Sequence, residues 1–451
     1  MSRARTPAVN IVGAGLAGAL LALLLARRGI GVRLLERRPD PRQASPERGR
    51  SINLALAARG MRALDRADVL GRVRPLLIPM RGRMVHDLSG QTALQPYGQR
   101  EHEVIFSVGR ADLNRVLIEE AARHEGVEVR FNQLCLGADP GATRLRFHDH
   151  SSGAAYELPL TPTVATDGAG SAVRASLTAA GLVSAREEWL DHDYKELTVP
   201  PVARRHALEP DALHIWPRGG FMLIALPNTD GSFTATLFLA RRGDKSFAAL
   251  ATPGAVADFF RREFADAVPL MPDLLGDFAA HPQGQLGTVH ASPWQIEGRV
   301  LLLGDAAHAI VPFHGQGMNA AFEDCVVLDE LVGQLGDWAT AFAEFEQARR
   351  PNAAAIAQMA LENYGEMRDA VLDARFLRRR QIALGLERRF PDRFIPRYSM
   401  VMFHPEIPYA EALRRGAVEA QLLDELDRGP GAEPDAALAE RLVCERLPPI
   451  G

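Results

Sequence analysis

The strongest constraint on this chain is a glycine-rich turn close to its first residue. Gly13, Gly15 and Gly18 follow the apolar run Val9 to Val12 and lead into a second, longer apolar stretch. A short apolar run, a glycine turn and a longer apolar segment are typical of a strand, a tight turn and a helix. The pattern predicts a βαβ unit with a strand at 8–12, a helix at 16–28 and a second strand at 31–36.

The residues of this turn suit a bound dinucleotide. Gly13 permits the tight turn, Gly15 lets the backbone approach a pyrophosphate at the start of the helix, and Gly18 lets the helix pack closely on the sheet. Glu36 ends the second expected strand, where a carboxylate can accept hydrogen bonds from ribose hydroxyls. We expect these four residues and the neighbouring Arg37 to contact the dinucleotide.

A second motif, much later in the chain, narrows the choice of dinucleotide. Gly304 and Asp305 end another apolar run, Val300 to Leu303. A carboxylate at the C-terminal edge of a strand can bind the hydroxyls of a ribityl chain, although Asp305 could instead cap a helix. A nicotinamide dehydrogenase would need the first motif alone, whereas FAD has both a pyrophosphate and a ribityl chain. The two motifs together predict FAD.

The loop after Asp305 has the composition expected beside a flavin ring. Gly315 and Gly317 let the backbone lie against the isoalloxazine, and the next helix would direct its N-terminus at the flavin C2 carbonyl. Negative charge collects there when the flavin is reduced, and a helix N-terminus stabilises it. The loop residues expected to bind the cofactor are Gly317, Met318 and Asn319, and those expected beside the reacting ring are Phe313 and His314.

The composition is that of an ordinary soluble globular protein. The chain has 451 residues, 47% hydrophobic and 24% charged, which suggests two or three domains. A net charge of −4 gives no reason to expect nucleic acid or an anionic membrane as a partner. The three cysteines lie far apart without a disulfide or metal pattern, and the apolar stretch Leu16 to Ala26 is too short to span a bilayer. We expect a cytoplasmic protein without a metal or a membrane anchor, either monomeric or dimeric.

Two further groups of polar residues predict no chemistry. The pair Glu119 and Glu120 lies on an expected amphipathic helix at 112–124, and we interpret it as a solvated helix face. Several histidines lack the spacing of metal ligands, and we expect them at the surface or in loops. These histidines are His86, His102, His148, His150 and His192.

Residues 213–239 interrupt the alternation of strands and helices. Three apolar runs there are rich in β-branched and aromatic residues, and Asn228 to Ser232 is a strong hairpin turn between the last two. We therefore expect an α/β fold in which a Rossmann-like FAD-binding domain carries an inserted antiparallel-sheet substrate domain and a C-terminal helical region. The expected boundaries are 1–75, 100–185 and 285–340 for the FAD-binding domain, 76–99 and 186–284 for the substrate domain, and 341–451 for the helical region, with a frayed tail and short helix at 429–451.

The motifs taken together resemble the class A FAD-dependent aromatic hydroxylases. The resemblance rests on the glycine turn, on Asp167 and Gly168 with Ser171 and Arg174, and on the second motif with its loop. Four more specific segments resemble the kynurenine-hydroxylating branch of that family. These segments are Gly49–Leu56, Asp193–Leu197, His214–Arg218 and Phe221–Asn228.

The resemblance implies a reaction. It would be the NADPH- and O₂-dependent hydroxylation of L-kynurenine to 3-hydroxykynurenine through a flavin C4a-hydroperoxide, in tryptophan degradation by the kynurenine pathway. The arylamine already donates electrons to its ring, so no dedicated base is required, and we expect His314 to shape the pocket instead. The chain has no second glycine fingerprint, which agrees with transient docking of NADPH. A hydroxylase for another aromatic acid is the alternative, and a non-catalytic flavin-bound redox sensor is a third possibility.

The resemblance also implies roles for individual residues. Arg83 and Tyr97 match the pair that holds the substrate carboxylate, a role that suits a guanidinium fork and a phenol. Asn363 and Glu366, three apart on an expected helix, and Tyr398 match polar contacts to the amino-acid end. The residues matching the apolar wall around the aniline ring are Leu213, Met222, Ile224, Leu226 and Phe238, and those matching further cofactor contacts are Arg110 and Asp167.

Overall fold

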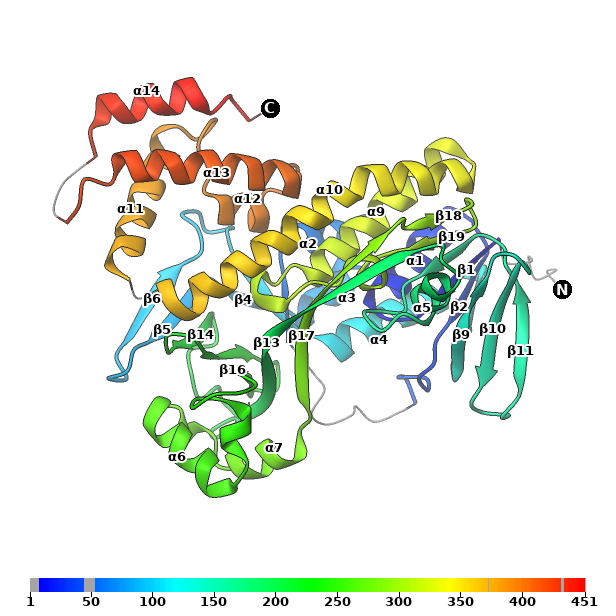
Figure 1. The fold of residues 1–451 in the computed structure, drawn as a ribbon, viewed down its shortest axis with the longest axis horizontal. Coiled ribbons are helices and arrows are strands. Elements are labelled where there is room, and N and C mark those ends of the chain that lie inside the picture. Colours follow the sequence, from blue (N-terminus) through cyan, green and yellow to red (C-terminus); the bar gives the residue numbers. More distant parts are fainter. Residues whose placement is uncertain (1–7, 44–52, 372, 431–433, 451) are drawn as a thin grey trace. The chain divides into compact units, whose positions relative to one another are not determined.

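The computed structural model of this chain describes residues 8–43, 53–371, 373–430 and 434–450 (Figure 1). The part of the Gly49–Leu56 segment before residue 53 lies outside the described residues. The chain forms two compact units. The first unit comprises 1–77, 108–190 and 286–357, and the second comprises 78–107, 191–285 and 358–451.

The first unit is built on a mostly parallel sheet. Its strand order is β18-β19-β12-β1-β2-β8, and all neighbours are parallel except the antiparallel pair β18 and β19. The predicted βαβ unit is confirmed as β1 (Val9–Val12), α1 (Leu16–Arg27) and β2 (Val32–Leu35). The other strands of this sheet are β8 (Val127–Arg130), β12 (Thr163–Ala165), β18 (Gln295–Ile296) and β19 (Val300–Leu302).

Helices bury the sheet of the first unit. α1 is buried along most of its length, from Leu16 to Leu25, because it packs against both α4 (Arg110–Ala122) and α9 (Gly317–Leu335). A small antiparallel sheet of three strands packs on α5 (Ala172–Ala179). The remaining elements that lie wholly in this unit are β3 (Asn53–Leu56), α2 (Ala58–Arg66), α3 (Leu70–Val73), β9 (Gln133–Asp139), β10 (Arg144–Asp149), β11 (Ala155–Pro159) and α8 (Asp305–His308).

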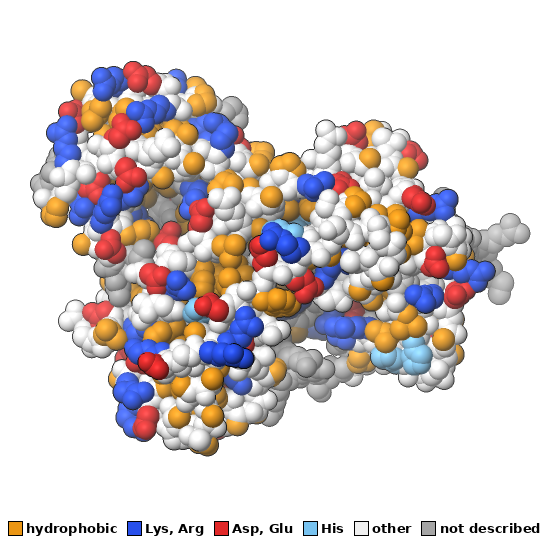
Figure 2. Space-filling view, in the orientation of Figure 1, with side chains coloured by type: hydrophobic (Ala, Val, Ile, Leu, Met, Phe, Trp, Pro, Cys, Tyr) orange, Lys and Arg blue, Asp and Glu red, His pale blue; other side chains and the backbone are white. Residues whose placement is uncertain are grey.

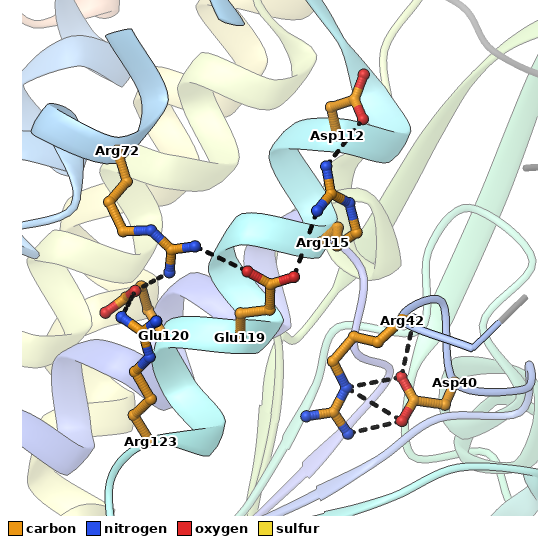
Figure 3. Close-up of polar contacts among 8 residues, drawn as sticks. All are labelled: Asp40, Arg42, Arg72, Asp112, Arg115, Glu119, Glu120 and Arg123. Atoms are coloured by element: carbon orange, nitrogen blue, oxygen red, sulfur yellow. Dashed lines mark hydrogen bonds and ion pairs between the residues drawn. The ribbon is translucent and has the colours of Figure 1, made fainter. Parts of the chain in front are cut away.

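The acidic pair on α4 belongs to an ion-pair network at the surface (Figure 3). Glu119 contacts Arg72 at 2.8 Å and Arg115 at 3.4 Å, and Glu120 contacts Arg123 at 2.6 Å. The Arg123 side chain is 64% exposed. The Glu119 and Glu120 side chains are 25% and 19% exposed, so the pair is half-buried and held in ion pairs with arginines.

The second unit is built on a largely antiparallel sheet. Its strand order is β17-β13-β16-β15-β14-β5-β6, and β14 and β5 pair in parallel. The predicted strands at 213–239 are confirmed as β14 (Ala212–Pro217), β15 (Met222–Pro227) and β16 (Phe233–Ala240). β13 and β17 each run from one unit into the other. The remaining bounds are β4 (Ile78–Met80), β5 (Gly82–His86), β6 (Thr92–Pro96), β7 (Ile105–Gly109), β13 (Ser184–Val199) and β17 (Gln283–Ser292).

One face of this sheet forms the main apolar core of the second unit. Trp216, Leu223 and Leu237 pack there against Phe259 and Phe260 of α6 (Pro253–Glu263). α7 (Leu274–Ala280) contributes to the same core. Because successive strand residues point to opposite faces, the alternate residues of β14, β15 and β16 lie on the other face.

The C-terminal helices have an apolar core of their own. The short helix expected within 429–451 is confirmed as α14 (Ala436–Arg446), which buries Leu442 and Val443 against Leu386 and Leu422. Charged side chains of both signs are interspersed on the visible face of these helices (Figure 2). Among the described residues, no helix is long and apolar enough to cross a membrane. The other helices are α10 (Trp338–Gly365), which runs from the first unit into the second, α11 (Ala374–Arg389), α12 (Arg397–Phe403) and α13 (Tyr409–Leu426).

The expectation for the histidines is wrong in two cases. His86 and His192 are buried in strands β5 and β13, at 4% and 7% exposure, whereas His148 is half-buried in strand β10. His102 and His150 are exposed, as expected. The neighbouring residues of a single histidine in a strand do not indicate whether it is buried, because burial depends on contacts with other strands. No cluster of three or more potential metal ligands occurs among the residues that the structure describes.

Candidate active site

The turn between β1 and α1 is tight at two of its three glycines. Gly13 has a φ of +98°, and a Cβ there would lie 2.6 Å from the Thr166 carbonyl oxygen. A Cβ on Gly18 would lie 1.9 Å from the Gly13 oxygen, so the helix can approach the turn only without a side chain. By contrast, a Cβ on Gly15 would meet no atom within 4 Å. The space in front of Gly15 is open, as a pyrophosphate at a helix N-terminus requires.

Glu36 is held at the end of β2 by hydrogen bonds from the backbone. Its carboxylate is buried and accepts from the backbone N–H groups of Ala14 at 2.8 Å and Arg38 at 3.0 Å. The Arg38 side chain also donates to it at 2.8 Å. Burial raises the pKa of Glu36, but these hydrogen bonds outweigh burial and hold the pKa below its ordinary value. The carboxylate therefore stays an acceptor, and Arg37 beside it is exposed.

Asp167 follows β12 and has an unused hydrogen-bonding atom. Its Oδ2 accepts weakly from the Val173 N–H at 3.3 Å. Its Oδ1 is buried and has no hydrogen-bond partner among the described residues. Burial raises the pKa of Asp167. A buried carboxyl oxygen of this kind costs free energy unless a ligand or water satisfies it.

Asp305 lies at the corresponding end of β19. It is the first residue of α8 and is exposed, and Gly304 before it has a φ of +61° and occupies the N-cap position. Asp305 is therefore not the capping residue of this helix. Arg174 of α5 donates to the Ala306 carbonyl oxygen at 3.0 Å and so ties α5 to the start of α8. The Asp305 carboxylate remains at the surface of the sheet edge.

The flavin-loop residues are tied to strand β3 through one side chain. Asn319 is fully buried in α9, where its Oδ1 accepts from the Ala57 N–H at 2.9 Å. Its Nδ2 donates to the Ala55 and Gly315 carbonyl oxygens at 2.9 and 2.8 Å. The Asn319 side chain thus shapes the loop through backbone contacts. Phe313 and His314 are buried in the short helix η4 (Pro312–His314), Gly315 has a φ of +65°, and Gly317 and Met318 begin α9 half-buried.

The strand order gathers these residues at one sheet edge. β19, β12, β1 and β2 are consecutive parallel neighbours, so their carboxyl ends lie side by side. Asp305, Asp167, the glycine turn and Glu36 follow these four strands in that order. Neighbouring strands are about 4.8 Å apart, so the four ends span roughly 14 Å. An extended dinucleotide lies across such an edge, and the open space at Gly15 and the unpartnered Asp167 Oδ1 fit FAD. Arg110 is exposed at the start of α4.

Sequence reasoning missed a buried charge network behind this edge. His308 Nε2 lies 2.7 Å from Asp324 Oδ2, and Arg349 contacts both Asp324, at 2.6 Å, and Glu323, at 2.7 Å. Arg59 contacts the same Glu323 at 2.5 Å. Burial raises the pKa of Asp324, but His308 and Arg349 outweigh it and hold the pKa below its ordinary value. These partners are far apart in sequence, so no local pattern could have indicated them.

In the second unit, four predicted substrate residues form one cluster. Arg83 of β5 is 8% exposed and donates to Glu366 Oε1 at 3.0 Å. Its guanidinium lies 5.8 Å from the ring centroid of Tyr97 and 5.1 Å from that of Tyr398, and the two rings stack on each other. Burial raises the pKa of both phenols, so they stay neutral hydrogen-bonding groups at neutral pH.

These four residues line a cavity of about 420 Å³. The cavity continues between α11, α12 and α13, where its lining includes Arg379, Arg380, Phe394 and Glu419. Arg380 is a candidate that sequence reasoning missed. Burial lowers its pKa and the nearby Arg83 lowers it further, so two guanidinium groups share this region with the Glu366 carboxylate. The surplus positive charge suits an anionic ligand group.

Asn363 is not brought into this cluster. α10 ends at Gly365, and the chain continues without a break into a π-helical turn (Glu366–Ala370). Asn363 is buried with its amide 3.4 Å from Met367 Sδ, and it does not line the cavity. Glu366 turns instead toward Arg83.

The predicted apolar wall shares one face of the sheet. In the pairing of β15 with β16, Met222 lies opposite Phe238 and Ile224 lies opposite Thr236. Leu213 pairs with Arg83, so these two side chains point to the same side. The face is the one opposite the phenylalanine-rich core. The five wall residues do not line the cavity at Arg83. They are Leu213, Met222, Ile224, Leu226 and Phe238.

A parallel sheet with a glycine turn at its switch point and acidic residues at neighbouring strand ends defines a dinucleotide-binding fold of the flavoprotein type. The model of the family described as FAD binding domain matches residues 5–360. The chain is 50% identical over 416 residues to the Kynurenine 3-monooxygenase of Stenotrophomonas maltophilia (strain K279a), which covers 92% of this chain and 91% of the relative. It is 47% identical over 453 residues to the Kynurenine 3-monooxygenase of Myxococcus xanthus (strain DK1622), covering 100% and 97%. The chain belongs to the kynurenine 3-monooxygenase family of FAD-binding-domain proteins.

Solved structures resemble the fold at lower identity. 2-Methyl-3-hydroxypyridine-5-carboxylic acid oxygenase superposes with a TM-score of 0.66 at 20% identity, covering 81% of this chain and 94% of that one. p-Nitrophenol 4-monooxygenase from Pseudomonas putida DLL-E4 superposes with a TM-score of 0.64 at 18% identity, covering 93% and 98%. At such identities the likeness establishes the fold alone.

Proposed function

We propose that this chain is an FAD-dependent monooxygenase that hydroxylates L-kynurenine to 3-hydroxykynurenine, with NADPH and O₂ as co-substrates, in tryptophan degradation. The observation that carries the proposal is the Arg83 cluster, a buried guanidinium beside two phenols and a carboxylate. It occurs in a chain half identical to a curated kynurenine 3-monooxygenase. When bound, FAD supplies the chemistry that activates O₂ with electrons from NADPH.

The residues of the first unit would hold the cofactor. Glu36 would accept from the adenosine ribose, and the backbone at Gly15 would face the pyrophosphate. Asp305 would bind the ribityl chain, and Asp167 would gain the partner that its Oδ1 lacks among the described residues. We therefore assign FAD binding to the first unit and substrate binding to the second.

The residues of the second unit would orient the substrate. Arg83 and Arg380 would bind the amino-acid carboxylate, because guanidinium groups bind carboxylates with charge-assisted hydrogen bonds. Glu366 would accept from the ammonium group, and the phenols of Tyr97 and Tyr398 would donate to the remaining carboxylate oxygen. The apolar face of β14, β15 and β16 would exclude water from the aromatic ring.

We propose that His314 shapes the pocket and removes no proton from the substrate. It is buried beside Phe313 in η4. The arylamine needs no deprotonation before an electrophilic oxygen attacks its ring. A His314→Ala variant that bound kynurenine normally, lost all hydroxylation and lacked one ionisation in its pH profile would contradict this role.

The function is tested with the purified holoenzyme. We expect a flavin absorption spectrum, NADPH oxidation stimulated by L-kynurenine, and 3-hydroxykynurenine as the product identified by mass spectrometry. A panel of other aromatic acids serves as the comparison. Preference for one of them would favour a different aromatic hydroxylase, and flavin without any substrate-stimulated turnover would favour a redox sensor. Cell fractionation tests the proposed cytoplasmic location.

A further inference from the structure

Two buried histidines lie on the far side of the proposed substrate-binding strands. His86 ends β5 and His214 lies in β14, with side chains 4% and 2% exposed. The strands pair in parallel, with Leu213 opposite Arg83 and His214 opposite Met84. Because side chains alternate between faces, His86 and His214 share one face while Arg83 and Leu213 lie on the other.

A chain of hydrogen bonds runs through these histidines. Asp266 Oδ2 lies 3.0 Å from His86 Nδ1, and His86 Nε2 lies 2.9 Å from His214 Nδ1. His214 Nε2 lies 2.8 Å from the Glu209 carbonyl oxygen. Trp216 stacks on the His86 ring at a centroid distance of 4.0 Å, and its Nε1 donates to Asp266 Oδ2 at 2.7 Å. The chain therefore links a carboxylate to a backbone carbonyl.

The donors and acceptors of this chain define the protonation state of His86. The Glu209 carbonyl can only accept, so His214 Nε2 carries a hydrogen. Burial lowers the pKa of His214 to about 4, so this ring is neutral near pH 7 and its Nδ1 accepts from His86 Nε2. Burial raises the pKa of Asp266, but hydrogen bonds from His86 and Trp216 outweigh it, so Asp266 is a carboxylate that accepts from His86 Nδ1. Both ring nitrogens of His86 carry hydrogen, and the ring is an imidazolium.

Other charged groups surround this pair. The Arg218 guanidinium donates to the His86 backbone carbonyl at 3.0 Å, and it lies in the field of the carboxylates Asp266, Glu263 and Asp87. Lys245 pairs with Glu263 at 2.8 Å, so two cations face two carboxylates besides Asp266. Asp211 raises the pKa of His214 by its charge. Its side chain is 45% exposed and lies outside the hydrogen-bond chain. The positive charge of His86 is thus balanced by the carboxylate that the ring contacts.

We propose that His86 is a positioning residue whose buried positive charge holds β5 and β14 in the arrangement that aims Arg83 at the carboxylate of an aromatic amino-acid substrate. The inference rests on the proposed function, which gives Arg83 its ligand. β5 has five residues, and Arg83 and His86 lie near its opposite ends on opposite faces. If His86 loses its proton, the neutral ring has one hydrogen for two acceptors, Asp266 Oδ2 and His214 Nδ1. Two acceptor atoms then face each other at one of these contacts, and the hydrogen-bond chain breaks there.

The first test measures the protonation of His86 directly. NMR spectra of the holoenzyme with ¹⁵N-labelled histidine, recorded from pH 6 to pH 9, should contain an imidazolium signal at pH 7 that disappears in His86→Gln. Asp266→Asn should convert that signal to a neutral ring near pH 7. A wild-type His86 with a single protonated nitrogen at pH 6 to 7 would overturn the proposal. The wild-type spectrum decides this point even if a variant fails to fold.

The second test measures kynurenine binding against pH. The wild-type Kd should weaken roughly three- to tenfold as the His86 signal loses its proton, the effect of one hydrogen bond. His86→Gln should bind more weakly by that factor at pH 7 with a flat profile, a raised KM and a kcat within about twofold of wild type. His206→Gln is the matched control, because His206 donates to the Asn228 backbone carbonyl in the same unit and lies outside the chain from Asp266 to Glu209.

Three results distinguish a failure of the positioning role of His86 from a failure of the proposed function. A His86→Gln profile identical to that of wild type would overturn the positioning role. A holoenzyme that binds another aromatic amino acid with the same His86 dependence would correct the proposed substrate and keep the role. A flavin-loaded protein that binds no aromatic amino acid at any pH would refute both the proposed function and the positioning role.

Discussion

Arg83 illustrates how burial distinguishes one side chain among many of its kind. The sequence contains many arginines, and the spacing around Arg83 does not separate it from those at the surface. In the structure it is 8% exposed and contacts Glu366, Tyr97 and Tyr398. A guanidinium removed from water needs partners, and this one has a single carboxylate beside it at 3.0 Å. Such a site favours a second anion.

Replacing Arg83 with alanine should weaken kynurenine binding. The carboxylate would lose a charge-assisted contact worth about 1.5–3 kcal/mol. Titration of the flavin spectrum with kynurenine measures the effect. Arg81→Ala is the control, because Arg81 is 60% exposed two residues away and contacts Asp211 only at 3.8 Å. Equal affinity of wild type and Arg83→Ala would refute the assignment.

Glu419 is a buried acid that should make the protein less stable as the pH rises. It is 3% exposed on α13, and burial raises its pKa from 4.5 to about 8 despite Arg415 and Arg397 nearby. Between these values the unfolded chain releases the proton while the folded chain retains it. Folding is therefore disfavoured progressively from about pH 4.5 to pH 8, and the loss is constant above that range.

Glu419→Gln should remove this dependence. We expect the variant to exceed wild type by about 3 kcal/mol at pH 7 and to match it near pH 4.5. Thermal unfolding midpoints from pH 4.5 to pH 8.5 measure the difference. Glu411→Gln on the same helix should show no such gain, because its hydrogen bond to Arg414 lowers the pKa of Glu411. A difference in unfolding midpoint between Glu419→Gln and wild type that stayed the same at every pH would contradict the expectation.

At the scale of elements, the turn between β1 and α1 was predictable because its requirements are local. Strand, turn and helix occupy a short stretch of chain, in which Gly13 has a positive φ and Gly18 leaves room for the Gly13 carbonyl oxygen. The contact that closes the turn was not predictable. Thr166, at the end of β12, donates from its hydroxyl to the Gly13 carbonyl oxygen at 2.8 Å. A partner so distant in sequence leaves no periodic signal.

The glycines of this turn should separate folding from cofactor binding. Gly18→Ala should destabilise the apo-protein by about 1–3 kcal/mol or more, because its Cβ would lie 1.9 Å from the Gly13 oxygen. Gly15→Ala should leave the apo-protein folded, because its Cβ meets no atom within 4 Å, but should weaken FAD binding by occupying the space for the pyrophosphate. Apo-protein melting temperatures and FAD titrations distinguish the two. Full FAD affinity in Gly15→Ala would contradict the proposed phosphate position.

At the scale of the whole molecule, the proposed cofactor and substrate residues belong to different compact units. All proposed FAD contacts lie in the first unit, and all proposed kynurenine contacts lie in the second. The chain passes between the units just before β4 and within β7, β13, β17 and α10. Each unit is therefore made of three separate segments of the sequence.

This division predicts that a substitution in the substrate site leaves FAD binding unchanged. Arg83→Ala should be purified with the same flavin content as wild type, because it alters no residue of the first unit. Flavin absorbance per protein measures the content, and Gly15→Ala is the opposite case, expected to lose flavin. A colourless Arg83→Ala protein that cannot be reloaded with FAD would contradict the separation.

The sequence by itself determined the α/β class, the βαβ unit, the antiparallel strands at 213–239 and the flavin cofactor, because each motif behind these predictions is a short stretch of the chain. Only the tertiary structure decided which distant side chains meet. It joined Arg83 to Glu366 across 283 positions and buried His86 against Asp266. Local periodicity fixes which face a residue occupies, but contacts between elements depend on how whole strands and helices pack.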